Sequence, residues 1–115
     1  MTNHSKSASE MPAATSVSPL QLAGYQEGAV VSRTLLKRGG GTITFFTFDA
    51  GQGLSEHTAP FDAVAYVLEG DAEITIDGTP VLVSGGEMVL MPAHQPHALT
   101  ARTKFKMLLT MIRSD

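Results

Sequence analysis

The side chains best suited to bind a metal or transfer a proton lie in the second half of the chain. They are His57, Asp62, His94 and His97. His57 opens the stretch HTAPFDAVAYVLEG (57–70), in which alanines occupy two inward-facing positions where further metal ligands would be most useful. Imidazole is a common metal ligand, and it also exchanges protons near neutral pH. This pattern leaves two hypotheses open, a metal site and a pocket without metal.

The elements that must position these residues are predicted to be β-strands. Short runs rich in Val, Ile, Leu, Thr and Phe are separated by Gly, Pro and Asp, and no helical periodicity of helix length competes with them. The runs are AVVSRTLLK, GTITFFTFD, DAVAYVLEG, DAEITID, TPVLVSGG, EMVLMP and KFKMLLTMIR. Many short strands at regular spacing predict an all-β sandwich or a closed barrel.

One turn is specific enough to predict a strand pairing. The dipeptide Asp77-Gly78 accepts the positive φ angles of a type I′ turn, which matches the twist of the flanking strands. We therefore expect residues 71–77 to pair with residues 79–84 in a hairpin.

Several of the predicted strands are apolar on both faces. One face of residues 105–112 carries Phe105, Met107, Leu109 and Met111, and the other face is also mostly apolar. A strand of this kind needs cover from a second sheet, from a partner chain, or from both. We therefore predict a homodimer.

Length and composition indicate one ordinary globular domain. The chain has 115 residues, 43% of them hydrophobic and 17% charged, with a formal net charge of -3. This balance lacks the basic surplus of nucleic-acid-binding proteins, so no nucleic-acid partner is expected. The absence of cysteine excludes disulfides and thiolate metal sites.

The N-terminal residues differ in composition from the rest. Residues 1–16 are small and polar, which predicts a disordered tail that leaves 17–115 as the barrel domain. The sequence has no apolar run of signal-peptide or membrane-spanning length. The expectation is a cytoplasmic protein that has no membrane partner.

The spacing of glycines and histidines resembles the first of two motifs of the cupins, a family of small double-stranded β-helix (jelly-roll) barrels. Gly51, His57 and Gly70 stand in the register of that motif. Ala59 and Ala63 stand where the motif has a second histidine and a glutamate.

The second cupin motif is matched after a short interval. Gly86, Pro92 and His97 keep its spacing, while His94 replaces a glycine and Ala101 replaces an asparagine. The resemblance covers roughly residues 29–112 and implies an all-β jelly-roll barrel in a single domain.

The resemblance also implies a divalent metal (Fe, Zn, Ni or Mn) inside the barrel, held here by His57 and His97. Two imidazoles are fewer than the three protein ligands of a typical catalytic zinc, so we expect metal binding to be weak or absent. Asp62 is a candidate third ligand, because Pro60 could reset the strand parity and turn this carboxylate inward. The resulting set of two histidines and one carboxylate suits non-haem iron. His94 could instead approach from its loop.

Each candidate also has a simpler explanation. The histidines of the barrel would bond to each other, to a neighbour or to water, Asp62 would be a solvated turn residue, and His94 a surface loop residue. Tyr66 adds either a hydroxyl or packing, and Met91 lines the core or a pocket. The predicted ligand-binding residues are His57, Asp62, Tyr66, Met91, His94 and His97.

Three functions are compatible with these residues. The first is a binding protein whose apolar barrel takes a small organic molecule, with a degenerate metal site. The second is a metal-dependent enzyme of the dioxygenase or isomerase type that uses His57, His97 and either Asp62 or His94. The third is a barrel that serves association alone. The fold does not decide among them, because one fold supports many chemistries.

Overall fold

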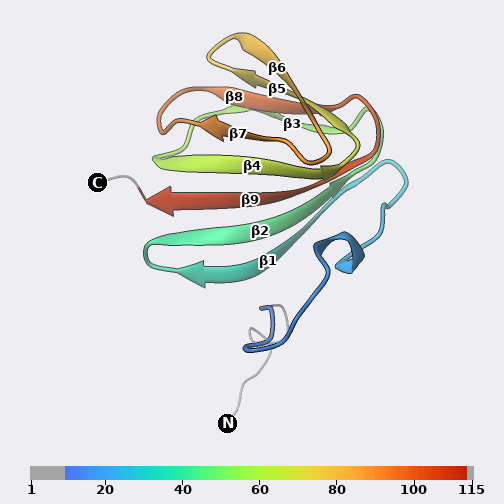
Figure 1. Cartoon of the computed structure of the whole chain (residues 1–115). Helices are drawn as coiled ribbons and strands as arrows, with labels where there is room; N and C mark the ends of the chain where they lie inside the picture. Colours follow the sequence, from blue (N-terminus) through green and yellow to red (C-terminus); the bar gives the residue numbers. More distant parts are fainter. Residues whose placement is uncertain (1–9, 114–115) are drawn as a thin grey trace.

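The computed structural model describes residues 10–113, which form two antiparallel sheets packed face to face (Figure 1). This architecture confirms the predicted all-β jelly roll. The elements are η1 (Pro19–Gln21), β1 (Val30–Arg38), β2 (Gly41–Phe48), β3 (Gly53–His57), β4 (Phe61–Glu69), β5 (Asp71–Ile76), β6 (Thr79–Ser84), β7 (Met88–Met91), β8 (His97–Ala101) and β9 (Phe105–Arg113). Among these residues, no helix is long and apolar enough to cross a membrane.

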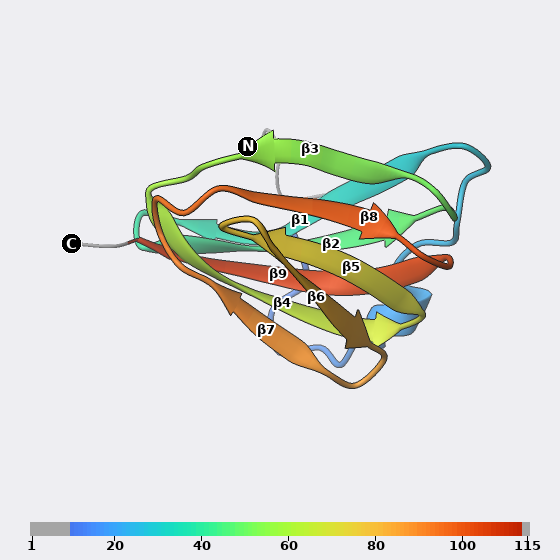
Figure 2. The same cartoon turned by 90° about the horizontal axis from the view of Figure 1, so that it is seen from above.

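The larger sheet has the strand order β1-β2-β9-β4-β7, and the smaller sheet has the order β3-β8-β5-β6. In the view of Figure 2 the smaller sheet overlies the larger one. Seven of the strands correspond to the predicted runs. The other two, β3 and β8, were not among those runs, and they carry the two barrel histidines.

The core lies between the two sheets and follows the two-residue alternation of the strands. In β4, Ala63, Ala65 and Val67 are buried and alternate with more exposed residues. The rings of Phe48 and Phe105 stack with their centroids 4.3 Å apart. The buried cluster consists of Phe48, Ala63, Ala65, Val67, Ala72, Ile74, Val83, Met91, Leu99, Ala101, Phe105 and Met107.

The segment before β1 covers part of the outer face of the larger sheet, a cover that the sequence did not predict. The Lys106 ammonium donates to the carbonyl of Leu20 at 2.6 Å, and the Thr47 hydroxyl donates to the carbonyl of Gly24 at 3.3 Å. Thr47 and Lys106 are a cross-strand pair on the face opposite to the core. The part of the outer face around Thr47 and Lys106 is therefore covered from within the chain.

Residues 10–16, predicted as part of the tail, also contact β1. The Met11 N–H donates to the carbonyl of Leu35 at 2.9 Å, and Arg38 lies 3.2 Å from a carboxylate oxygen of Glu10. The rest of the predicted tail, residues 1–9, lies outside the described residues. The position of the domain boundary stays a prediction.

The predicted hairpin is confirmed. Strand β5 pairs with β6 from Asp71 opposite Ser84 to Ile76 opposite Thr79. Both residues of the turn have positive φ, 49° at Asp77 and 82° at Gly78, as a type I′ turn requires.

The turn can be tested with a matched pair of glycines. A Cβ added at Gly78 or at Gly40 meets nothing within 4 Å, but only Gly78 has a positive φ. We expect Gly78→Ala to lower the free energy of unfolding by about 1 kcal/mol, because a Cβ is strained in the left-handed region. Gly40→Ala should cost nothing. Urea unfolding measures both, and equal losses would contradict the assignment of the turn.

Candidate functional site

The predicted site residues lie mostly at one end of the sandwich, which we call the histidine end. It is formed by the loops 58–60 and 92–96 and by the turn between β5 and β6, at the left of Figure 1. Backbone hydrogen bonds join these segments: His94 donates to the carbonyl of Ala59, and Asp77 donates to that of Pro96, both at 2.8 Å. The end is thus held together by main-chain contacts.

His57 and His97 are brought together as direct partners of the β3–β8 pairing. Their ring centroids are 4.3 Å apart and the rings meet edge to face at 72°. His97 is buried, with 7% of its surface exposed, whereas His57 is exposed. One imidazole of the pair therefore lies in the interior and the other lies at the surface.

Each imidazole of the pair is oriented by a carbonyl two residues earlier. His57 Nδ1 lies 2.8 Å from the carbonyl oxygen of Ser55, and His97 Nδ1 lies 3.3 Å from that of Gln95. A carbonyl only accepts, so these contacts assign the proton of each neutral ring to Nδ1. The two Nε2 atoms are then hydrogen-bond acceptors.

Burial lowers the pKa of His97 below the usual value of 6.5, and the charge of His57 lowers it further. The contact with the Gln95 carbonyl opposes this shift but does not cancel it. His97 is consequently held neutral at physiological pH, as an acceptor rather than a cation.

A row of inward-facing residues crosses the larger sheet at the same end. The cross-strand partners in this row are Thr42, Met111, Ala63 and Met91. Met91 is almost fully buried, as expected for a residue that lines the interior. The Thr42 hydroxyl is also buried and has no hydrogen-bond partner among residues 10–113. A buried hydroxyl without a partner costs about 1–3 kcal/mol, so it is a ready site for a ligand or a water.

Asp62 and His94 lie at this end but are not brought to the histidine pair. Asp62 alternates with the buried Ala63, is exposed on the outer side of β4, and accepts a hydrogen bond from the Ala93 N–H at 2.9 Å. The inward turn considered for this carboxylate is therefore absent, because Pro60 precedes β4 and leaves its alternation intact. His94 is exposed in its loop at a φ of 68°.

Tyr66 lies farther along β4, on the outer face. It alternates with the fully buried Ala65 and Val67, and its cross-strand partners are Leu108 and Met88. The structure thus places the hydroxyl of Tyr66 on the side of the sheet opposite to the interior.

Three further residues at the histidine end were missed by the sequence analysis. Ile76 is the cross-strand partner of His97 on β5, and Phe61 is paired with Arg113. The Arg113 guanidinium lies 6.0 Å from the Phe61 ring centroid, and its Nε donates to the carbonyl of Gly39. The two-residue alternation of β4 could have identified Phe61, because Phe61 lies two positions before Ala63 and therefore faces the same side of the sheet.

The described residues do not fit a resident metal of the kind that the cupin resemblance implies. Within residues 10–113, no group of three or more His, Cys, Asp or Glu side chains is arranged to hold a metal ion. Ala59 lies beyond the end of β3, and Ala63 is packed in the core. Only the two imidazoles are placed as neighbouring donors.

Comparison with known proteins agrees with this geometry at the level of the family. A family model described as a cupin domain matches residues 44–113. No curated protein matches the sequence.

Solved structures give the same result. A conserved protein of unknown function from Streptococcus pyogenes is 37% identical, with a TM-score of 0.87 over 92% of this chain and 93% of its own. A cupin 2 conserved barrel domain protein from Leptotrichia buccalis is 36% identical, with a TM-score of 0.78, over 82% of this chain but only 46% of its own. A cupin superfamily protein from Desulfitobacterium hafniense is 27% identical, with a TM-score of 0.84, over 91% of this chain and 96% of its own. With the jelly roll and both motif registers in place, these matches show that the chain belongs to the cupin family.

Proposed function

We propose that the protein binds a small organic molecule at the histidine end, and that it does so without a resident metal. The observation that carries the proposal is the His57–His97 pair, in which both Nδ1 atoms are satisfied by backbone carbonyls. When a ring of the pair is in its neutral form, this arrangement leaves its Nε2 as a hydrogen-bond acceptor. A ligand with a hydroxyl or acid proton matches such an acceptor.

The surroundings of the pair favour a ligand that also has an apolar part. Ile76 neighbours His97 across the strands, and Met91 lies in the inward-facing row of the same end. The unpartnered hydroxyl of Thr42 in that row offers a further polar contact. A few polar groups among apolar side chains are typical of small-molecule sites.

Arg113 adds a reason to favour an acidic ligand. It is the cationic side chain at the end of β9, where it lies over Phe61. A carboxylate could bind the guanidinium while an O–H of the same molecule donates to an imidazole. A small aromatic or aliphatic hydroxy acid has both groups.

The ligand class can be tested with phenol and toluene, which differ by one hydroxyl. We expect phenol to shift the NMR signals of His57 and His97 and to bind about 5-fold more tightly than toluene, because one hydrogen bond contributes about 1 kcal/mol. His97→Phe should abolish this preference. Thr42→Val should leave the fold intact while weakening phenol binding. Equal affinity for phenol and toluene would contradict the proposal.

The lowered pKa of His97 predicts how the stability of the protein depends on pH. The folded-state pKa lies below the unfolded value of 6.5, so the folded protein binds fewer protons between these two values. The contribution of the neutral ring to stability is therefore present above about pH 6.5 and is lost as the pH falls through the folded pKa. We expect unfolding experiments from pH 8 to pH 5 to show this decrease, and His97→Leu to reduce it.

The contribution of His57 to the lowered pKa of His97 can be tested separately. His57→Gln removes the neighbouring charge but not the burial, so the pKa of His97 should rise part of the way toward its usual value. Histidine titration by NMR measures this change directly. A His97 pKa at or above 6.5 in the natural protein would refute the electrostatic description of the pair.

A further inference from the structure

The interior groups of the proposed ligand site are closed to solvent. His97 is 7% exposed, Met91 is 1% exposed, and the hydroxyl of Thr42 is buried. A ligand can contact these groups only when an element of the protein moves aside. The question of which element moves rests on the proposed function, because it concerns how the same ligand reaches the same groups.

The loop 92–96 is the element best placed to move. It begins after Met91, the last residue of β7, and it ends before His97, the first residue of β8. Because β7 belongs to the larger sheet and β8 to the smaller one, the loop crosses the histidine end from one sheet to the other. A displacement of this loop therefore acts directly on two of the buried groups.

Few hydrogen bonds tie this loop to the segments beside it. Two of its five residues are prolines, which have no N–H group, so the loop has three main-chain donors. The Ala93 N–H donates to the carboxylate of Asp62 at 2.9 Å. The His94 N–H donates to the carbonyl of Ala59 at 2.8 Å. The third donor bonds within the loop, to the carbonyl of Pro92 at 3.4 Å, so the Asp62 carboxylate supplies one of the two external acceptors for these N–H groups.

The same loop has a strained backbone. His94 has a φ of 68°, in the left-handed region that is unfavourable for a residue with a Cβ. The bonds of the loop to its neighbours must offset this cost. Strain of this kind is typical of elements that have two alternative conformations beside a binding site.

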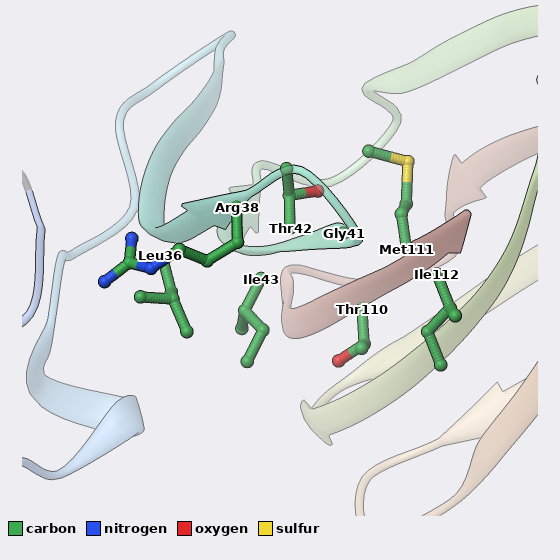
Figure 3. A pocket seen from close by; sticks show the side chains of 8 residues that line it. All are labelled: Leu36, Arg38, Gly41, Thr42, Ile43, Thr110, Met111 and Ile112. Atoms are coloured by element: carbon green, nitrogen blue, oxygen red, sulfur yellow. The ribbon is translucent and has the colours of Figure 1, made fainter.

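We propose that the loop 92–96 is a gate over the proposed ligand site and that the carboxylate of Asp62 is its latch. Asp62 is then a positioning residue, which acts on the site through the loop and does not contact the ligand. It pairs with Ile112 on the outer face of the larger sheet. Figure 3 shows Ile112 on the side of this sheet opposite to Thr42 and Met111. The latch therefore lies outside, where it can open without disturbing the inward-facing groups.

The gate also carries the group that orients the buried imidazole. The carbonyl of Gln95, within the loop, lies 3.3 Å from Nδ1 of His97. Opening of the loop removes this contact, and closing restores it. The closed loop therefore covers the bound ligand and at the same time holds the His97 ring in the orientation that the ligand requires.

The first test measures opening without a ligand, by amide hydrogen exchange in the folded protein. Asp62→Ala should speed the exchange of the Ala93 and His94 amides roughly tenfold, because a hydrogen bond to a charged acceptor is lost. The substitution leaves the Ala59 carbonyl in place, so faster exchange at His94 reports movement of the whole loop. The amide of Val67, near the other end of β4, is the control and should exchange as in the natural protein.

Two further variants separate the latch from other effects of Asp62. Asp62→Asn removes the same charge but keeps a side-chain oxygen that can accept the Ala93 N–H, so it should retain most of the protection. His94→Gly should slow the exchange of Ala93 about threefold, because glycine adopts a positive φ without strain. Circular dichroism verifies that each variant folds. Acceleration confined to Ala93, or equal acceleration in Asp62→Asn and Asp62→Ala, would overturn the proposal.

The second test measures the passage of a ligand, with phenol as the probe. Asp62→Ala should raise the association and dissociation rate constants of phenol by the same factor and leave its dissociation constant within about twofold, because a gate limits both directions equally. NMR line shapes of His57 and His97 measure both rate constants. An unchanged association rate constant would overturn the gate. Failure of the natural protein to bind phenol would refute the proposed function alone, because amide exchange decides the latch without a ligand.

Discussion

The two-residue alternation of the strands, fixed by the register of β4 between β9 and β7, decides which side chains can meet in this protein. Ala63, Ala65 and Val67 must face the smaller sheet, because only that arrangement buries them. Asp62 is then directed outward and Tyr66 lies on the outer face. A shift by one residue would exchange the two faces and expose the core. This constraint keeps the Asp62 carboxylate away from the interior of the histidine end.

Much of the frame could be predicted from local sequence. The runs rich in β-branched residues became strands, and the Asp77-Gly78 turn set a pairing that the structure reproduces. The spacing of glycines and histidines identified the family. These features depend on residues close together in the chain, where propensity and turn chemistry are informative.

Other features could not be predicted because they depend on distant partners. GLSEH and HALTA contain few residues that favour strands, and they become β3 and β8 through pairing with each other and with β5. The contact between His57 and His97 exists only through that pairing. The cover provided by the N-terminal segment likewise depends on Lys106, far along the chain. No local pattern signals these contacts.

The protein combines the intact fold of its family with an altered site. Alanines at 59 and 63 leave two imidazoles, each oriented by a backbone carbonyl, where the resemblance implies a metal with four ligands. The neutral state of His97 follows from its burial beside another imidazole. The site is then suited to hydrogen bonding.

Calorimetric titration of chelator-free protein with zinc tests this account most directly. Two imidazoles leave most of the coordination sphere to water, so we expect a dissociation constant above roughly 10 µM, equivalent to about -7 kcal/mol. Tight one-to-one binding that disappears in Asp62→Ala or His94→Ala would contradict it, and would show that this cupin has rebuilt its metal site from residues that the structure places apart from the histidine pair.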